Sequence, residues 1–346
     1  MLINTPGKFP KLKALYFLTN FKSWGDDAPY TLQGMFHRHG FQVKPLGELR
    51  ELQTVFVNPV TDEKIPVNYF AHLDEEKQLL TCFTQATSEQ IQDTIAPLSG
   101  EIGIYHLWIS PIAFDQIKSM ILGEHPYARI KRFHADRHPA VGFPAKLRPE
   151  VNRSFTYRGE DGKETLEELR YHYGVLPRYI DFSIPGLADF RANNRGIFHY
   201  LAGQLDCMFG YAERAVNLVI QVREILEHSK LEVIPLTTER GSRRVPYIVP
   251  WWINFKRTMD VRDGELLLEQ LEDRKFSAYD TVVTEGSVHL DATVLDEQKK
   301  SIFMISSDGR HMGVTPRYQT GFDSFLRFYE SVAEYFDPDA TCVATL

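Results

Sequence analysis

A short basic segment stands out in an otherwise acidic chain. Between residues 125 and 158 the sequence carries eight Lys and Arg against two Asp and Glu, whereas the whole chain has a net charge of −7. Aromatic residues alternate with these cations. Lys and Arg bind phosphodiesters and aromatic rings stack on exposed bases, so this composition indicates a nucleic-acid contact. The cations of this segment, which we call the basic island, are Arg129, Lys131, Arg132, Arg137, Lys146, Arg148, Arg153 and Arg158.

A second cluster of cations and aromatic residues lies between positions 240 and 257. If the fold brings this cluster beside the basic island, the two form a groove with both ingredients of nucleic-acid binding. The alternative is that these arginines pair with acidic groups of the same chain or of another subunit. The residues expected to contact nucleic acid here are Arg240, Arg243, Arg244, Trp251, Trp252, Lys256 and Arg257.

Two histidines, His134 and His138, are spaced four residues apart with Asp136 between them. That spacing lets two imidazoles share one metal ion on a helix. However, Pro139 follows directly and Arg137 would repel a cation. We therefore expect no metal site, and we expect these histidines to be ordinary surface or phosphate-contacting residues.

A metal-dependent hydrolase or nuclease remains the enzymatic alternative. Such an enzyme needs an acid and an acid-x-Lys pair on neighbouring strands, and the nearest match is Asp291 with Glu297 and Lys299. A second acidic pair, Asp181 and Asp189, flanks a Pro-Gly turn. The sequence contains no Gly-x-Ser-x-Gly elbow and no dinucleotide fingerprint. We therefore expect no cofactor, and we favour a protein that is not an enzyme.

Composition predicts a folded chain in a reducing compartment. Hydrophobic residues make up 43% of the sequence and charged residues 25%, the usual balance of a globular protein. The three cysteines, Cys82, Cys207 and Cys342, are odd in number and far apart, and no pair has zinc-finger or redox spacing. No apolar run approaches the roughly 20 residues that span a bilayer. We therefore expect a cytoplasmic location and no membrane contact.

The strongest periodic pattern predicts a long helix at about residues 198–228. Apolar residues recur there alternately every four and three residues, which is the spacing of a heptad seam. The seam could bind a partner helix or a second copy, or it could be a central helix packed between sheets. Its members are Leu201, Leu205, Met208, Ala212, Ala215, Val219, Val222 and Leu226.

The C-terminal third predicts a three-stranded antiparallel meander followed by a helix. Alternating apolar residues at 288–294, a run at 302–305 and a strand near Val314 are separated by polar turns. Apolar residues then recur at helical spacing from Phe322 to Phe336. We expect an α+β protein with mixed or antiparallel sheets and a long central helix. Its two subdomains should be residues 1–135 and 136–346.

These patterns lead to one favoured function and two alternatives. The favoured function is a non-catalytic component of a cytoplasmic assembly that contacts DNA or RNA through its basic and aromatic surface, with a protein partner or a homodimer expected. The first alternative is the metal-dependent hydrolase or nuclease. The second is a protein-interaction subunit that makes no contact with nucleic acid.

Overall fold

The chain forms two compact units. The computed structural model describes residues 11–26, 28–137, 145–148, 151–227, 231–238, 241–284 and 289–343, with the backbone alone at 225–227, 231–238, 241–247 and 289. The first unit contains the chain up to residue 137 and residues 153–217, and the second contains 138–152 and 218 onward. The division therefore differs from the boundary at 135–136 expected from the sequence, because the strands after residue 153 complete the sheet begun before it.

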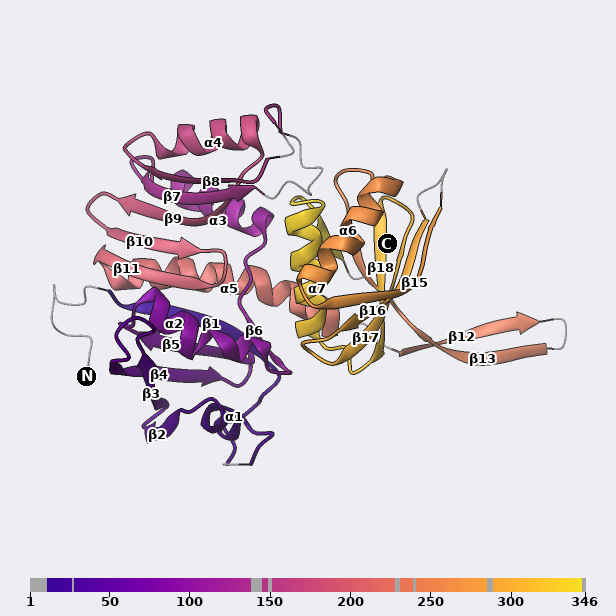
Figure 1. Cartoon of the computed structure of the whole chain (residues 1–346), viewed down its shortest axis with the longest axis horizontal. Coiled ribbons are helices and arrows are strands. Elements are labelled where there is room, and N and C mark those ends of the chain that lie inside the picture. Colours follow the sequence, from indigo (N-terminus) through magenta and orange to yellow (C-terminus); the bar gives the residue numbers. More distant parts are fainter. Residues whose placement is uncertain are drawn as a thin grey trace. The chain divides into compact units, whose positions relative to one another are not determined.

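The first unit is built on one large sheet, whose strands lie in the order β2-β3-β4-β5-β1-β11-β10-β9-β7-β8, with β6 also paired to β1 (Figure 1). Every pairing is antiparallel. The described strands of this sheet are β1 (Lys13–Thr19), β2 (Gln42–Leu46), β3 (Leu49–Val57), β4 (Lys64–Asp74), β5 (Leu79–Thr84), β6 (Ile104–His106), β7 (Arg129–Arg137), β8 (Arg153–Arg158), β9 (Leu176–Ile184), β10 (Ala188–Asn193) and β11 (Ile197–Gly203). Its helices are α1 (Leu32–Arg38), α2 (Ser88–Thr94), the 3-10 helix η1 (Ala96–Gly100), α3 (Pro111–Glu124), α4 (Gly162–Tyr173) and α5 (Leu205–Glu227).

The two halves of this sheet repeat one arrangement. A strand, a helix and a four-stranded meander follow one another as β1, α1 and β2–β5, and then again as β6, α3 and β7 with β9–β11. The hairpin strand β8 and helix α4 are an addition to the second half. In each half the first strand of the meander is the farthest from β1 and the last strand, β5 or β11, pairs with β1. The two halves therefore meet at β1.

Helices cover one face of the sheet over its first half. Leu15 of β1 belongs to the same buried apolar cluster as Leu32 of α1 and Ile91 of α2. Side chains alternate along a strand, so Lys13 points to the same side as Leu15. We call this side the Lys13 face.

The opposite face is covered over the second half. Ala14 lies on that face and pairs with Phe198 of β11, which in turn pairs with Ala192 of β10. Phe190, two residues before Ala192, stacks on Tyr211 of α5 with ring centroids 5.9 Å apart. The core of the second half therefore lies on the face opposite to Lys13.

Helices α3 and α4 pack on the same side as α5. The Tyr211 hydroxyl donates to Glu124 at the end of α3 over 2.9 Å, and Asp115 of α3 forms an ion pair with Arg170 of α4. Among the described residues, the Lys13 face of β7–β11 is thus left without a covering helix. This open face is where exposed cations of the basic island lie.

The close approach of α4 to β7 requires a glycine. A Cβ on Gly162, the first residue of α4, would lie 2.1 Å from the carbonyl oxygen of Ile130 in β7. That oxygen belongs to the sheet backbone, so the helix would have to move away. We expect Gly162→Ala to lower the free energy of unfolding by about 1–3 kcal/mol, measured by urea denaturation.

The matched control is Gly210→Ala in α5. Gly210 is exposed, and a Cβ there meets nothing within 4 Å. Alanine favours a helix by about 1 kcal/mol over glycine, so this change should be neutral or stabilising. Equal losses from the two substitutions would contradict the steric argument.

The long helix begins later than the heptad spacing predicts. Residues 197–203 form β11, so Leu201 is in a strand and is exposed. Gly203 has a φ of +87°, which ends the strand, and α5 starts at Leu205. Met208 and Val219 of the seam are buried. This part of the seam therefore packs inside the chain.

The second unit contains a six-stranded antiparallel sheet in the order β15-β16-β17-β18-β14-β19 and a separate two-stranded ribbon, β12-β13, within the described residues. The predicted meander and the C-terminal helix are confirmed as β16–β18 and α7. The elements are β12 (Leu231–Thr238), β13 (Gly241–Ile248), β14 (Trp251–Asn254), α6 (Val261–Asp273), β15 (Phe276–Thr284), β16 (His289–Asp296), β17 (Ser301–Ser307), β18 (His311–Tyr318), α7 (Phe322–Tyr335) and β19 (Thr341–Val343).

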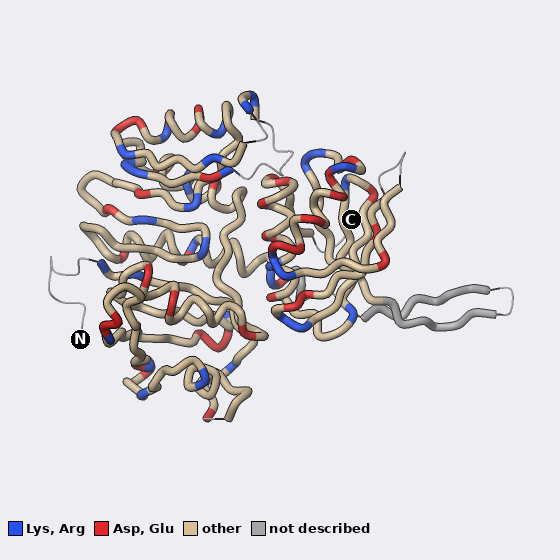
Figure 2. Tube along the Cα trace, viewed as in Figure 1, with Lys and Arg blue, Asp and Glu red and all other residues tan. Residues whose placement is uncertain are grey.

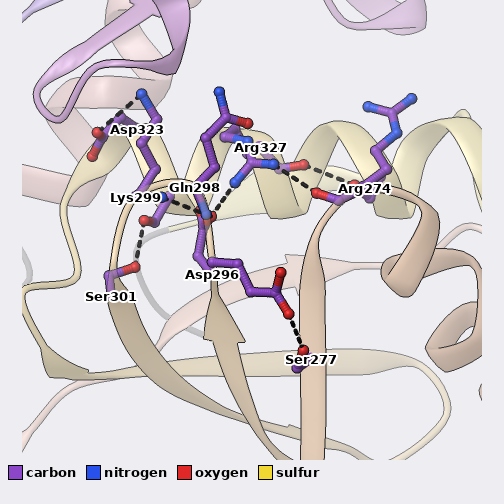
Figure 3. Close-up of polar contacts among 11 residues, drawn as sticks. Arg274, Ser277, Asp296, Gln298, Lys299, Ser301, Asp323 and Arg327 are labelled. Atoms are coloured by element: carbon purple, nitrogen blue, oxygen red, sulfur yellow. Dashed lines mark hydrogen bonds and ion pairs between the residues drawn. The ribbon is translucent and has the colours of Figure 1, made fainter.

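Charged side chains are buried where α7 packs on the turn between β16 and β17. Every residue of α7 is buried. Lys299 lies 3.5 Å from Asp323 of α7, and Arg327 forms an ion pair with Asp296 (Figure 3). These pairs explain how a helix with charged residues can be enclosed, because buried charges are tolerated when they are paired.

The α+β class is thus shown, with antiparallel sheets and a long helix. No helix in the described part of the chain is long and apolar enough to cross a membrane.

Candidate functional site

A line of polar side chains crosses the open face of the first unit. Arg132 of β7 pairs with Arg158 of β8 and with Asp181 of β9. Directly opposed residues of antiparallel strands point to the same side, so pairing from strand to strand traces one line. The register continues through β10 and β11 to β1. The polar row consists of Arg158, Arg132, Asp181, Arg191, His199 and Lys13.

The centre of the polar row is held by a two-point ion pair. Arg191 donates from Nε to Asp181 Oδ1 over 2.5 Å and from Nη2 to Oδ2 over 2.9 Å. These hydrogen bonds raise the pKa of Arg191. The guanidinium also lies 4.1 Å from the centre of the Tyr179 ring. Arg191 is therefore fixed in position, and its hydrogen bonds to Asp181 use Nε and Nη2 and not Nη1.

Aromatic rings lie beside the row. The ring of His134 stacks on Tyr179 with centroids 5.8 Å apart and planes inclined by 22°. Arg132 places its guanidinium 5.8 Å from the same tyrosine ring. Thr156 of β8 lies 3.0 Å from His134 Nδ1. The result is a platform of flat cationic and aromatic groups on neighbouring strands.

The two ends of the polar row differ in burial. Arg158 and Arg132 are exposed and Lys13 is only 8% exposed, whereas between them Asp181 is buried and Arg191 and His199 are half-buried. Basic residues recur on β7 and β8 at the open end (Figure 2). One end of the row is thus open to solvent, and the other is closed.

Charges at the closed end are unbalanced. The Lys13 ammonium donates to the carbonyl oxygen of Ala86, and no carboxylate of the described residues lies within ion-pair distance of it. Burial, followed by the charges of Arg191 and Lys11, lowers the pKa of Lys13. Burial, followed by the charges of Lys13 and Arg191, lowers the pKa of His199 to about 4, so this imidazole is neutral at pH 7.

An open hollow of about 730 Å³ lies where β9 ends, β10 begins and β11 ends. Lys131 pairs with Asp189 there over 3.2 Å, and Arg129 pairs with Glu160 over 2.7 Å. Lys131 and Arg129 are therefore paired with acids of the same unit.

Other predicted residues serve the fold or lie elsewhere. Arg137 is buried, and Arg153 stacks on the Tyr173 ring at 4.5 Å. Lys146 and Arg148 are exposed in the short described segment 145–148. None of these four belongs to the polar row.

The second basic cluster lies in the other unit. Trp251 is buried against Phe325 with ring centroids 5.1 Å apart. Arg257 pairs with Asp263 over 2.8 Å and lies 4.0 Å from the Phe336 ring. Both side chains therefore take part in packing the second unit, and Trp251 is buried there and not exposed as predicted.

The remaining members of the second cluster have different surroundings. Trp252 is half-buried and Lys256 is exposed. Arg240 lies outside the described residues, as do the side chains of Arg243 and Arg244 on β13.

The acids of the nuclease alternative are not brought together. Asp291 lies on β16 six residues before Glu297, a separation of about 20 Å along an extended chain. Lys299 is buried against Asp323 beyond the end of that strand. Asp181 and Asp189 each pair with a different cation. No group of three metal-ligating side chains occurs among the described residues.

Sequence reasoning missed four residues of the site: Tyr179, Arg191, His199 and Lys13. The alternation of polar residues at 179, 181 and 183 and at 189, 191 and 193 marks one face of each strand. It does not reveal which strands are neighbours. Only the pairing of β9, β10, β11 and β1 shows that these residues form one line.

Comparison with known proteins adds a family match without a function. Residues 117–195 match a protein family under the description AF_0896_M family middle domain. A protein of Archaeoglobus fulgidus, described as uncharacterized, is 25% identical over 347 residues, covering 95% of this chain and 89% of that protein. No solved structure matches the chain. The family segment includes β7 to β10, and with them four of the six residues of the polar row.

Proposed function

We propose that this protein binds single-stranded nucleic acid on the open face of β7–β11. The observation that carries the proposal is the polar row, in which exposed Arg132 and Arg158 border the stacked rings of His134 and Tyr179. Unpaired bases stack on aromatic rings and on guanidinium planes, while cations attract the phosphates. The role is binding rather than catalysis.

A flat sheet favours a single strand over a duplex. The bases of a duplex are already stacked, so they cannot lie on His134 and Tyr179. Among the described residues of the first unit, the platform also presents no protruding helix or ribbon that could enter a major groove, and the ribbon β12-β13 belongs to the second unit. The acidic net charge of −7 fits the same view, because attraction is confined to one face and a long duplex would be repelled elsewhere.

The test is a salt titration of binding to fluorescently labelled single-stranded DNA, single-stranded RNA and duplex DNA. We expect Arg132→Glu to weaken single-strand binding about tenfold and to reduce the slope of log affinity against log salt by about 0.7 for each phosphate that the variant no longer neutralises. Tyr179→Ala should cost about 1–3 kcal/mol of binding free energy, because a base then has no ring to stack on.

Lys64→Glu provides the matched charge reversal. Lys64 is exposed on β4, in the other half of the sheet. It should leave the affinity and the salt slope near those of the wild type. Absence of binding at low salt, or equal losses from Arg132→Glu and Lys64→Glu, would refute the proposed function.

A further inference from the structure

The closed end of the polar row is short of negative charge. Lys13 is buried, yet its only described partner is the neutral carbonyl of Ala86. Its register partner is His199, and His199 pairs in turn with Arg191. A buried ammonium without an acid is costly, and an anion bound beside it would reduce that cost.

His199 points to the same requirement. Its Nε2 atom is buried and makes no hydrogen bond within the structure. Lys13 and Arg191 lie on either side of His199. Both are hydrogen-bond donors, so neither can accept a hydrogen bond from the imidazole. A neutral imidazole can donate one hydrogen bond from Nε2 to an oxygen placed between the two cations.

The position of Lys13, His199 and Arg191 favours binding of the terminal phosphate of a nucleic-acid strand over binding of an internal phosphate. Beyond Lys13 the row meets Thr84 of β5, which is buried, and Ala86, which belongs to the apolar cluster under α2. A nucleic-acid strand that lies along the row from Arg158 and Arg132 therefore reaches buried side chains of the protein at Lys13. A phosphate monoester also carries about −1.5 to −2 charge at pH 7 and exposes three acceptor oxygens, more than an internal phosphodiester offers.

From these contacts we infer that Lys13, His199 and Arg191 bind the terminal phosphate of the nucleic-acid strand. This inference rests on the proposed function and makes it more specific: the protein recognises strand ends that carry a monoester phosphate. Arg191 is held for this contact by Asp181, and Lys13 by Ala86, so both cations are positioned before the ligand arrives.

The experiment uses the full chain and one oligonucleotide sequence in three forms: a 5′-phosphate, a 3′-phosphate and hydroxyls at both ends. We expect one phosphorylated form to bind about tenfold more tightly than the hydroxyl form, as expected when a charged group gains hydrogen bonds. Inorganic phosphate should reduce this preference and leave hydroxyl-strand binding almost unchanged. Fluorescence anisotropy measures all three affinities.

Lys13→Met is the diagnostic variant. It removes the buried charge and keeps a long apolar side chain, so thermal unfolding should show a folded protein. It should bring the affinity for the phosphorylated strand down to the affinity that the same variant shows for the hydroxyl strand. Arg132→Glu, by contrast, should weaken all three forms equally.

The outcomes separate the two proposals. If the wild type binds all three forms equally, the terminal-phosphate site is wrong and single-strand binding stands. If no form binds, both are wrong. The comparison among the three forms is made on the wild type, so it does not depend on the folding of any variant.

Discussion

Asp296→Ala should lower the free energy of unfolding of the second unit by about 3–5 kcal/mol. Asp296 is fully buried, and it accepts hydrogen bonds from Arg327 and from the backbone N–H groups of Gln298 and Lys299, both at 3.0 Å. Removal of the carboxylate leaves the Arg327 guanidinium buried without its acid (Figure 3). Urea denaturation followed by tryptophan fluorescence measures the loss.

Glu297→Ala is the control for this prediction. Glu297 is the next residue in the same turn and is exposed, and its carboxylate accepts a hydrogen bond from the Ser277 hydroxyl. Exposed polar contacts contribute little, so its loss should cost less than about 1 kcal/mol. The idea that the buried pair anchors α7 fails if the two alanine variants are equally stable.

The elements of the second unit follow from local patterns. Alternation from residue 289 and the polar turn at 297–300 specify β16 and β17, and the helical spacing after Phe322 specifies α7. The burial of Asp296 and Lys299 does not follow from the sequence. Asp296 and Lys299 read as solvent-exposed turn residues until α7 packs over them with Arg327 and Asp323.

The first unit shows why the binding face could not be predicted. Strand neighbours there are set by contacts between distant segments, such as Lys13 with His199. The basic island drew attention to β7 and β8, where Arg132 and Arg158 do lie on the open face. The same reasoning also selected Arg137, which is buried. Residue type gives the charge, whereas the sheet register decides which charges are exposed together.

The start of α5 illustrates a second limit. Leu201 fits both the heptad spacing and the alternation of a strand. The neighbours of Leu201, Tyr200 and Ala202, pair with β10, and the positive φ of Gly203 then turns the chain before the helix begins. Tertiary pairing decided between two periodicities that overlap in the sequence.

Lys299→Met should change how the stability of the second unit depends on pH. Burial lowers the pKa of Lys299 to about 8, and Asp323 opposes this shift only in part. In the unfolded chain the pKa returns to about 10.4. Between pH 8 and 10 the unfolded state therefore binds more protons than the folded state, and the contribution of Lys299 to stability rises with pH.

The expected rise is about 1.4 kcal/mol per pH unit in the difference between wild type and Lys299→Met. Urea denaturation at pH 7, 8, 9 and 10 measures it, and the buried tyrosines and cysteines cancel because both proteins contain them. Below pH 8 the difference should be constant, since the lysine is charged in both states. Lys300→Met, at the exposed neighbouring residue, should show no such rise. A parallel pH dependence for wild type and Lys299→Met would mean that the ammonium of Lys299 is not desolvated by α7.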